Sequence, residues 1–281
     1  MKVQYINSYG DVIDLLNFNT RVKDANFHDY EWEYDSIEQQ YGIDITRFRK
    51  TAKEYEATIV FKGDLDTRKR NLNRFFEIAE KDIIDKNPGK IIWDDYYINA
   101  YAVSSSTYPN DDSGWTQKDV IFLCTYPFWI TEEKRLFAKI EIPSSGLDEF
   151  LDYEYDYNYD YAVSNVGDVI WKVDHYAPCE FLMTVYGPCV DPQVVINGHT
   201  YQVYATLDTN DYMQIDSRNN KVIKYAANGT QQDLYDMRAK QESVFDPIDP
   251  GNVRVVWSGG FGFDLTLYCE RSEPRWKTQN S

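Results

Sequence analysis

Alternation of apolar and polar residues with a period of two runs through much of this sequence. Residues 54–61 and 263–270 show it most clearly, with every second side chain apolar, which is typical of a strand that buries one face. The same pattern, interrupted by short polar segments, predicts a mostly β protein. The further strands expected are residues 2–6, 21–23, 91–93, 96–103, 115–126, 194–196, 200–204, 212–216, 222–225 and 253–257.

Only one segment has the spacing of an amphipathic helix, residues 66–84. Asp66 or Thr67 can cap its start, and Asn87-Pro88-Gly89 can end it. We expect the apolar side of this helix to pack on a sheet. The residues that form the apolar stripe are Leu72, Phe75, Phe76, Ala79 and Ile83.

The opposite side of the expected helix is basic. It carries Arg68, Lys69, Arg70, Arg74 and Lys81. One interpretation is an ordinary solvated helix face, and the other is a docking face for an acidic neighbour.

Turn signals are frequent in the second half. Asn197-Gly198 between two β-rich runs predicts a two-residue hairpin, because both residues tolerate a positive φ. Several short strands at this spacing, without long helices between them, predict a β-sandwich. In the first half we expect Asp94-Asp95 to turn a hairpin, residues 29–41 to form an acidic loop or edge, and residues 104–114 to form a polar loop.

A low-complexity segment lies between the two halves. From residue 152 to residue 161, acidic or amide residues alternate with tyrosines. The interpretations left open are an edge strand or linker whose tyrosines contact a neighbour, and an irregular calcium site, since the spacing of an EF-hand loop is absent. The tyrosines are Tyr153, Tyr155, Tyr157, Tyr159 and Tyr161.

Length and charge narrow the picture further. The 281 residues exceed what one core usually supports, and we expect two domains, residues 1–135 and 136–281. The formal net charge of −17 argues against direct affinity for nucleic acid and against binding to an anionic membrane. Aromatic residues make up 16% of the chain, a composition that suits strands and protein–protein interfaces.

Signals of catalysis are weak. The sequence has no phosphate-binding loop, dinucleotide fingerprint or nucleophile elbow, and its 3 histidines are scattered. Cys179 and Cys189 have matching contexts but lack the paired spacing of a zinc site, so buried thiols are the better interpretation. Because the sequence shows neither an export signal nor an apolar stretch of the length of a transmembrane helix, we expect the 4 cysteines to be reduced. We predict no catalytic residue, no metal site and no cofactor.

Taken in order along the chain, these features resemble the distal tail proteins of siphophages. The resemblance extends over nearly the whole length. It is carried by the helix before a Trp/Tyr hairpin, Tyr126-Pro127-Phe128-Trp129, the Tyr-Asp run at 155–161, Ile196-Asn197-Gly198, Ile215-Asp216-Ser217, Pro250-Gly251-Asn252, Val255-Val256-Trp257, residues 264–268 and the ending Glu273-Pro274-Arg275-Trp276.

The resemblance implies a mainly β fold, with an N-terminal β-sheet domain holding one α-helix and a C-terminal galectin-like β-sandwich. It implies a homo-oligomer, a hexameric ring that can stack, at the virion tail tip. There the ring joins the major tail protein of the tube to the tail-tip hub protein and the receptor-binding proteins, without enzymatic activity. The expected interface residues are Tyr5, Arg68, Arg70, Arg74 and the five tyrosines of 153–161. Alternatives are a carbohydrate-binding module, with Trp171 and Trp257 as exposed contacts, and a cell-wall hydrolase.

Overall fold

The computed structural model describes residues 1–110, 114–140 and 167–276. The chain forms two compact units, each with its own hydrophobic core. Unit 1 contains Met1–Thr131 and the chain from Glu270 onward, and unit 2 contains Glu132–Cys269. Unit 2 is therefore an insertion in unit 1. The chain leaves unit 1 along β10 (Trp129–Phe137) and returns to it along β21 (Phe263–Arg271).

Unit 1 contains two antiparallel sheets that share one long strand, β8. The first half of β8 belongs to the sheet with the strand order β2-β1-β7-β8. The second half of β8 belongs to the sheet with the order β8-β9-β6-β3. A register shift between Ala102 and Ser104 marks the change, as expected of a β-bulge, which bends a strand. The strands are β1 (Val3–Ile6), β2 (Val12–Asp14), β3 (Thr20–Ala25), β6 (Lys53–Lys62), β7 (Gly89–Trp93), β8 (Tyr96–Asn110) and β9 (Trp115–Cys124).

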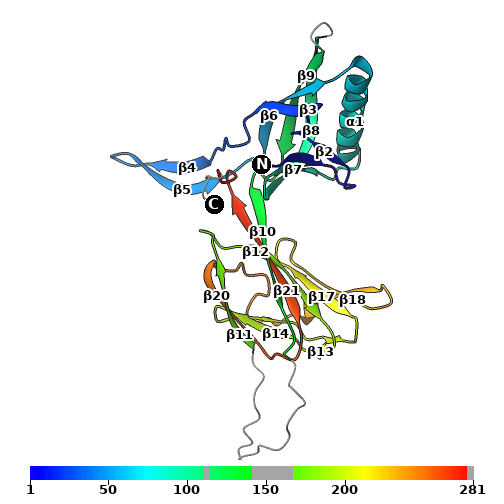
Figure 1. Ribbon diagram of the computed structural model, residues 1–281. Coiled ribbons are helices and arrows are strands. Elements are labelled where there is room, and N and C mark those ends of the chain that lie inside the picture. The colour runs from blue at the N-terminus through cyan, green and yellow to red at the C-terminus, as the bar shows by residue number, and fades with distance from the viewer. Residues whose placement is uncertain (111–113, 141–166, 277–281) are drawn as a thin grey trace, which may run out of the picture. The chain divides into compact units, whose positions relative to one another are not determined.

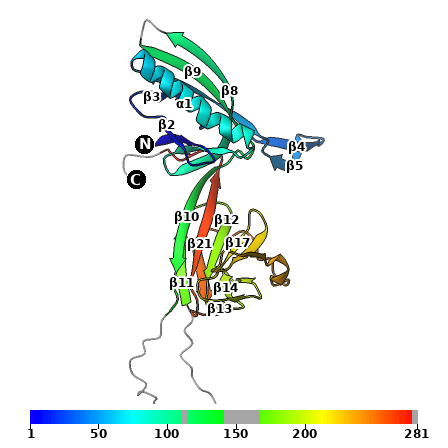
Figure 2. The same ribbon diagram turned by 90° about the vertical axis from the view of Figure 1, so that its right-hand side faces the viewer.

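Helix α1 (Leu65–Ile84) lies along the sheet that contains β6 and β8 (Figure 2). Its N-cap is Asp64, whose carboxylate accepts a hydrogen bond from the Thr67 amide at 2.8 Å, so the expected caps Asp66 and Thr67 were wrong. The predicted apolar stripe was also only partly right, because Phe76 and Ile83 are exposed. The helix instead buries Arg68, Phe75, Ile78, Ala79 and Asp82.

A two-stranded hairpin projects from unit 1, as both views show (Figures 1 and 2). It is formed by β4 (Glu33–Glu38) and β5 (Ile43–Arg49). The acidic loop or edge expected over residues 29–41 corresponds to β4, an edge strand of this two-stranded sheet, and the loop segments on either side of it, but the pairing with β5 was not predicted. Gly42 has a φ of +88° in the connecting turn, a value that glycine adopts without strain. This hairpin is called the arm below.

Unit 2 is a β-sandwich. One sheet has the order β19-β18-β17-β12-β21-β10, the other β11-β20-β14-β15, and side chains of both fill one core. The strands are β11 (Gly167–Val173), β12 (Glu180–Tyr186), β14 (Gln193–Ile196), β15 (His199–Gln202), β17 (Tyr212–Asp216), β18 (Lys221–Tyr225), β19 (Gln231–Asp233) and β20 (Gly251–Trp257), with the short pair β13 (Cys189–Val190) and β16 (Thr206–Leu207).

These observations confirm the predicted fold class: mainly β, with one helix among the described residues of unit 1 and a sandwich in unit 2. The Asn197-Gly198 hairpin is confirmed, with φ of +52° and +88°. The polar loop expected over 104–114 was wrong, since β8 continues to Asn110 and pairs with β9. The galectin-like description and the division at residues 135 and 136 stay predictions.

Candidate assembly surfaces

A buried polar contact joins β1 to the end of α1. The Tyr5 hydroxyl donates to Asp82 Oδ2 at 2.5 Å, and the Ser8 amide donates to Asp82 Oδ1 at 2.8 Å. Burial, reinforced by the hydrogen bond to Asp82, raises the pKa of Tyr5, so its hydroxyl stays protonated and donates. Gly89 leaves room for this contact, since a Cβ there would lie 2.4 Å from Asp82 Oδ2. Tyr5 is therefore a core residue of unit 1.

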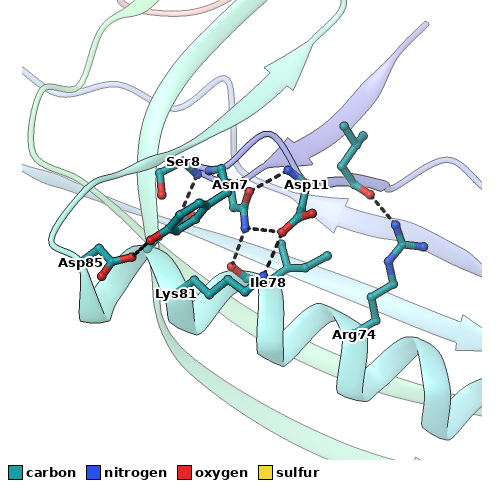
Figure 3. A network of polar contacts seen from close by, with 10 residues as sticks. Asn7, Ser8, Asp11, Arg74, Ile78, Lys81 and Asp85 are labelled. Carbon is teal, nitrogen blue, oxygen red and sulfur yellow. Dashed lines mark hydrogen bonds and ion pairs between the residues drawn. The ribbon is translucent and has the colours of Figure 1, made fainter.

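The turn between β1 and β2 is fastened to α1 by a second network, which extends from the buried Asn7 to the exposed Lys81 (Figure 3). The side-chain amide of Asn7 donates to Asp11 Oδ2 at 3.1 Å and to the Ile78 carbonyl oxygen at 3.4 Å. Lys81 Nζ lies 3.1 Å from the same Asp11 oxygen. Hydrogen bonds from Lys81 and Asn7 lower the pKa of Asp11. Lys81 thus contacts its own unit rather than a neighbour.

Arg70 and Arg74 lie on the exposed side of α1. Arg74 donates to the Val12 carbonyl oxygen at 3.1 Å (Figure 3), and Arg70 donates to Thr67 Oγ1 at 3.4 Å. Both line a hollow of about 740 Å³ between the helix and the segment from Val12 to Thr20. Their guanidinium groups are accessible, so their part in an interface stays a prediction.

Arg68 does not belong to the solvated basic face on which it was expected. Its side chain is buried, and Nη1 lies 3.4 Å from Thr116 Oγ1 of β9. Lys118 is buried as well, with Nζ 3.4 Å from Thr107 Oγ1, and burial lowers its pKa. Arg68, like Tyr5, is covered by its own unit, so its position gives no support to a contact with another copy.

Of the predicted interface residues, the structure brings together Arg70 and Arg74 on the helix, while Tyr5 and Arg68 are in the interior of unit 1. The other five residues lie outside the described part of the chain: Tyr153, Tyr155, Tyr157, Tyr159 and Tyr161.

The arm is a surface that the sequence analysis missed. At its base, Lys50 Nζ donates to the Pro127 carbonyl oxygen at 3.1 Å and lies 4.4 Å from the centroid of the Phe128 ring. Burial, with Lys53 nearby, lowers the pKa of Lys50 to about 8. The base is thus anchored, whereas every residue of β5 is exposed. The alternation of Ile43 and Ile45 with polar residues directly after Gly42 was the sequence signal that could have predicted a strand here.

The described residues give little support to chemistry in unit 2. Cys179 Sγ lies 3.6 Å from Cys269 Sγ rather than beside Cys189. No group of three or more His, Cys, Asp or Glu in the described ranges is placed to hold a metal ion. Trp171 and Trp257 are only 8% and 5% exposed, so the sugar contacts suggested for them were wrong. None of the described helices is long and apolar enough to cross a membrane.

Comparison with known proteins places this arrangement among phage tail structures. No protein-family model and no curated protein matches the chain. The solved structures include the Dit protein of phage SPP1, described as a paradigm of the hub adsorption apparatus in phages that infect Gram-positive bacteria. It is 13% identical with a TM-score of 0.62, over 96% of this chain and 98% of that one.

Chains of the phage P2 baseplate in its activated conformation are similar as well. The structure with Ca is 12% identical with a TM-score of 0.62, over 98% of this chain and 100% of that one. The structure with Sr has the same identity and coverage and a TM-score of 0.61. The chain therefore has the fold of these tail-hub and baseplate proteins, which confirms, for the fold, the predicted resemblance to siphophage distal tail proteins.

Proposed function

We propose that this chain is a structural protein of a siphophage tail tip and works as one copy in a ring. The observation that carries the proposal is the extent of the structural match, 96–98% of this chain and 98–100% of the neighbours. A sandwich alone is shared by many unrelated proteins. A match over both units, including the helix-bearing unit into which the sandwich is inserted, is far more specific than a shared sandwich.

The finer parts of the proposal come from the family resemblance. The ring is hexameric, lies between the major tail protein of the tube and the tail-tip hub protein, and contacts receptor-binding proteins. The baseplate neighbours support assembly with other tail proteins, since a baseplate is an assembly of many chains. The surface of unit 1 is consistent with such contacts, because α1 exposes Leu65, Phe76, Ile83 and Ile84 beside Arg70. In this role the chain binds partners and catalyses no reaction.

Electron microscopy of the purified full chain tests the proposal directly. We expect rings with sixfold symmetry and, in light scattering, a species of six copies of the 33.0 kDa chain. A species of 33.0 kDa at every concentration, with no rings in the micrographs, would refute the proposal.

A further inference from the structure

The two faces of the arm differ in chemistry. Residues paired across an antiparallel ladder share a face. Tyr34 pairs with Phe48, Ser36 with Ile45 and Glu38 with Ile43, so one face is mostly apolar. The other face holds the pairs Glu33 with Arg49, Asp35 with Arg47 and Ile37 with Asp44.

The apolar face of the arm is uncovered. Tyr34, Ile43, Ile45 and Phe48 are 43–58% exposed. With about half of each side chain in water, they form a patch of roughly 300–400 Å², within the range of the largest apolar patch on a typical monomer, which is often functional. An isolated two-stranded hairpin is at best marginally stable in water. The arm therefore gains stability when another surface covers this face.

Charge indicates what that surface must be like. Near the base of the arm, Arg49 lies 2.8 Å from Glu33 and 3.6 Å from Asp35, so these two carboxylates are already paired. Nearer the tip, Glu38 and Asp44 form no ion pair with any described residue. On its apolar face, the distal part of the arm thus presents Ile43 and Ile45 together with the unpaired carboxylate of Glu38, whereas Asp44 lies on the opposite face.

A groove of matching chemistry lies elsewhere on unit 1, where β3, β6 and β9 run side by side. It has a volume of about 530 Å³. Its charged lining residues are all cations, Arg21, Lys23 and Lys62, and none of them forms an ion pair with a described residue. Val22 and Trp115, both partly exposed, supply apolar surface between them.

The arm cannot fill the groove of its own chain. Its base is anchored at Pro127, near the end of β6 where Lys53 pairs with Cys124. The groove lies at the other end of β6, seven to nine residues away, which at 3.3 Å per residue is about 23–30 Å. The arm strands span about 20–23 Å by the same rise, no more than the shortest of these distances, and the arm points away from the sheet in both views (Figures 1 and 2).

We propose that the arm of one copy binds in the groove of a second copy of this chain. Ile43, Ile45 and Phe48 cover Val22 and Trp115. Glu38, on the same face of the arm, approaches the cations of β3 and β6. Because arm and groove are different surfaces, the contact is head-to-tail, the type that closes into a ring. The inference rests on the proposed ring and assigns one of its interfaces.

The test uses charge reversal of each surface in the full chain. The arm variant is Glu38→Lys, and the groove variant is Arg21→Glu with Lys23→Glu. Each variant alone is expected to raise the concentration at half-assembly roughly tenfold or more, because like charges then meet across the contact. The three substitutions combined in one chain are expected to restore assembly.

Mixing the two variants gives a sharper readout. An arm-variant copy keeps an intact groove and a groove-variant copy keeps an intact arm. The intact arm pairs with the intact groove and the reversed arm pairs with the reversed groove, so the mixture is expected to assemble at concentrations at which neither variant assembles alone. The matched control is Lys221→Glu with Lys240→Glu in unit 2, which reverses two exposed cations and is expected to assemble as the wild type does.

The outcomes separate this inference from the ring itself. Wild-type rings together with arm and groove variants that assemble normally overturn the arm–groove contact and leave the ring standing. Loss of assembly in the control as well overturns it too, because the effect is then one of net charge. A wild type that stays at 33.0 kDa at all concentrations overturns both proposals. Circular dichroism and the Tm of each variant establish that it is folded.

Discussion

Replacing Tyr5 by Phe removes one hydroxyl from the core of unit 1 and leaves the aromatic side chain in place. In the wild type this hydroxyl donates to Asp82 Oδ2 at 2.5 Å, in a region closed to water. After the substitution, Asp82 keeps its hydrogen bond from the Ser8 amide but has no donor for the other oxygen. The change therefore tests the contact between β1 and α1 with little effect on packing.

The expected loss is about 2 kcal/mol, since a hydrogen bond to a charged group contributes roughly 1.5–3 kcal/mol and water cannot replace the buried donor. This loss is expected in the free energy of unfolding of unit 1. Hydrogen exchange detected by mass spectrometry separates the units by peptide, and a loss of about 2 kcal/mol speeds exchange of the β1 and α1 amides roughly 30-fold. Amides of β12, β17 and β21 in unit 2 are expected to be unchanged.

Tyr9→Phe is the matched control. The Tyr9 hydroxyl also donates to a carboxylate, Asp85 Oδ2, at 2.5 Å, but Tyr9 is exposed and water can replace it (Figure 3). We expect no measurable change for this variant. Equal effects of Tyr5→Phe and Tyr9→Phe would show that burial does not set the strength of these bonds, and unchanged β1 and α1 protection in Tyr5→Phe would refute the assignment of Tyr5 to the core.

Three further predictions concern single positions. Gly89→Ala places a Cβ 2.4 Å from Asp82 Oδ2 and is expected to cost unit 1 about 3 kcal/mol or more, measured by the same exchange experiment. Trp171→Ala is expected to destabilise unit 2 by about 3–5 kcal/mol in urea unfolding, and a folded variant that merely loses glycan binding would contradict this. The hydrogen bond from Lys224, 2.8 Å away, lowers the pKa of Asp211 in the folded protein. This pair therefore stabilises unit 2 fully at a pH above the pKa of an unfolded Asp, about 3.9. The stabilisation is lost as the pH falls through the lower pKa that Asp211 has in the folded protein. Urea titrations between pH 2 and 7 are expected to show a shallower pH dependence for Asp211→Asn.

Sequence patterns predicted the helix and many of the strands because alternation and turn residues act locally, but they missed β10, β11 and β12. Asn197-Gly198 is an example, since the positive φ of both residues is a property of the residues themselves. The buried face of α1 was harder to predict. Arg68 and Asp82 face the interior because Thr116, Tyr5 and the Ser8 amide meet them there, and these partners are distant in sequence. A hydrophobicity pattern contains no information about such partners.

The candidate surfaces were less predictable for a related reason. Exposure of the arm depends on where the chain turns away from the sheet, and Lys50 fixes that point through Pro127. The groove depends on the register of β6 with its neighbours, which brings Arg21 opposite Val60 and Lys62 opposite Trp115. Both are properties of the tertiary structure.

The insertion of unit 2 has a consequence for synthesis. Tyr126 donates to Glu270 at 2.6 Å, and the ring of Trp276 stacks on His28 with 3.8 Å between centroids, so unit 1 needs residues translated after the whole of unit 2. On the ribosome the sandwich emerges complete while unit 1 still lacks its last segment. Any contact between copies that needs a complete unit 1 can therefore form only after residues 270–276 have been translated.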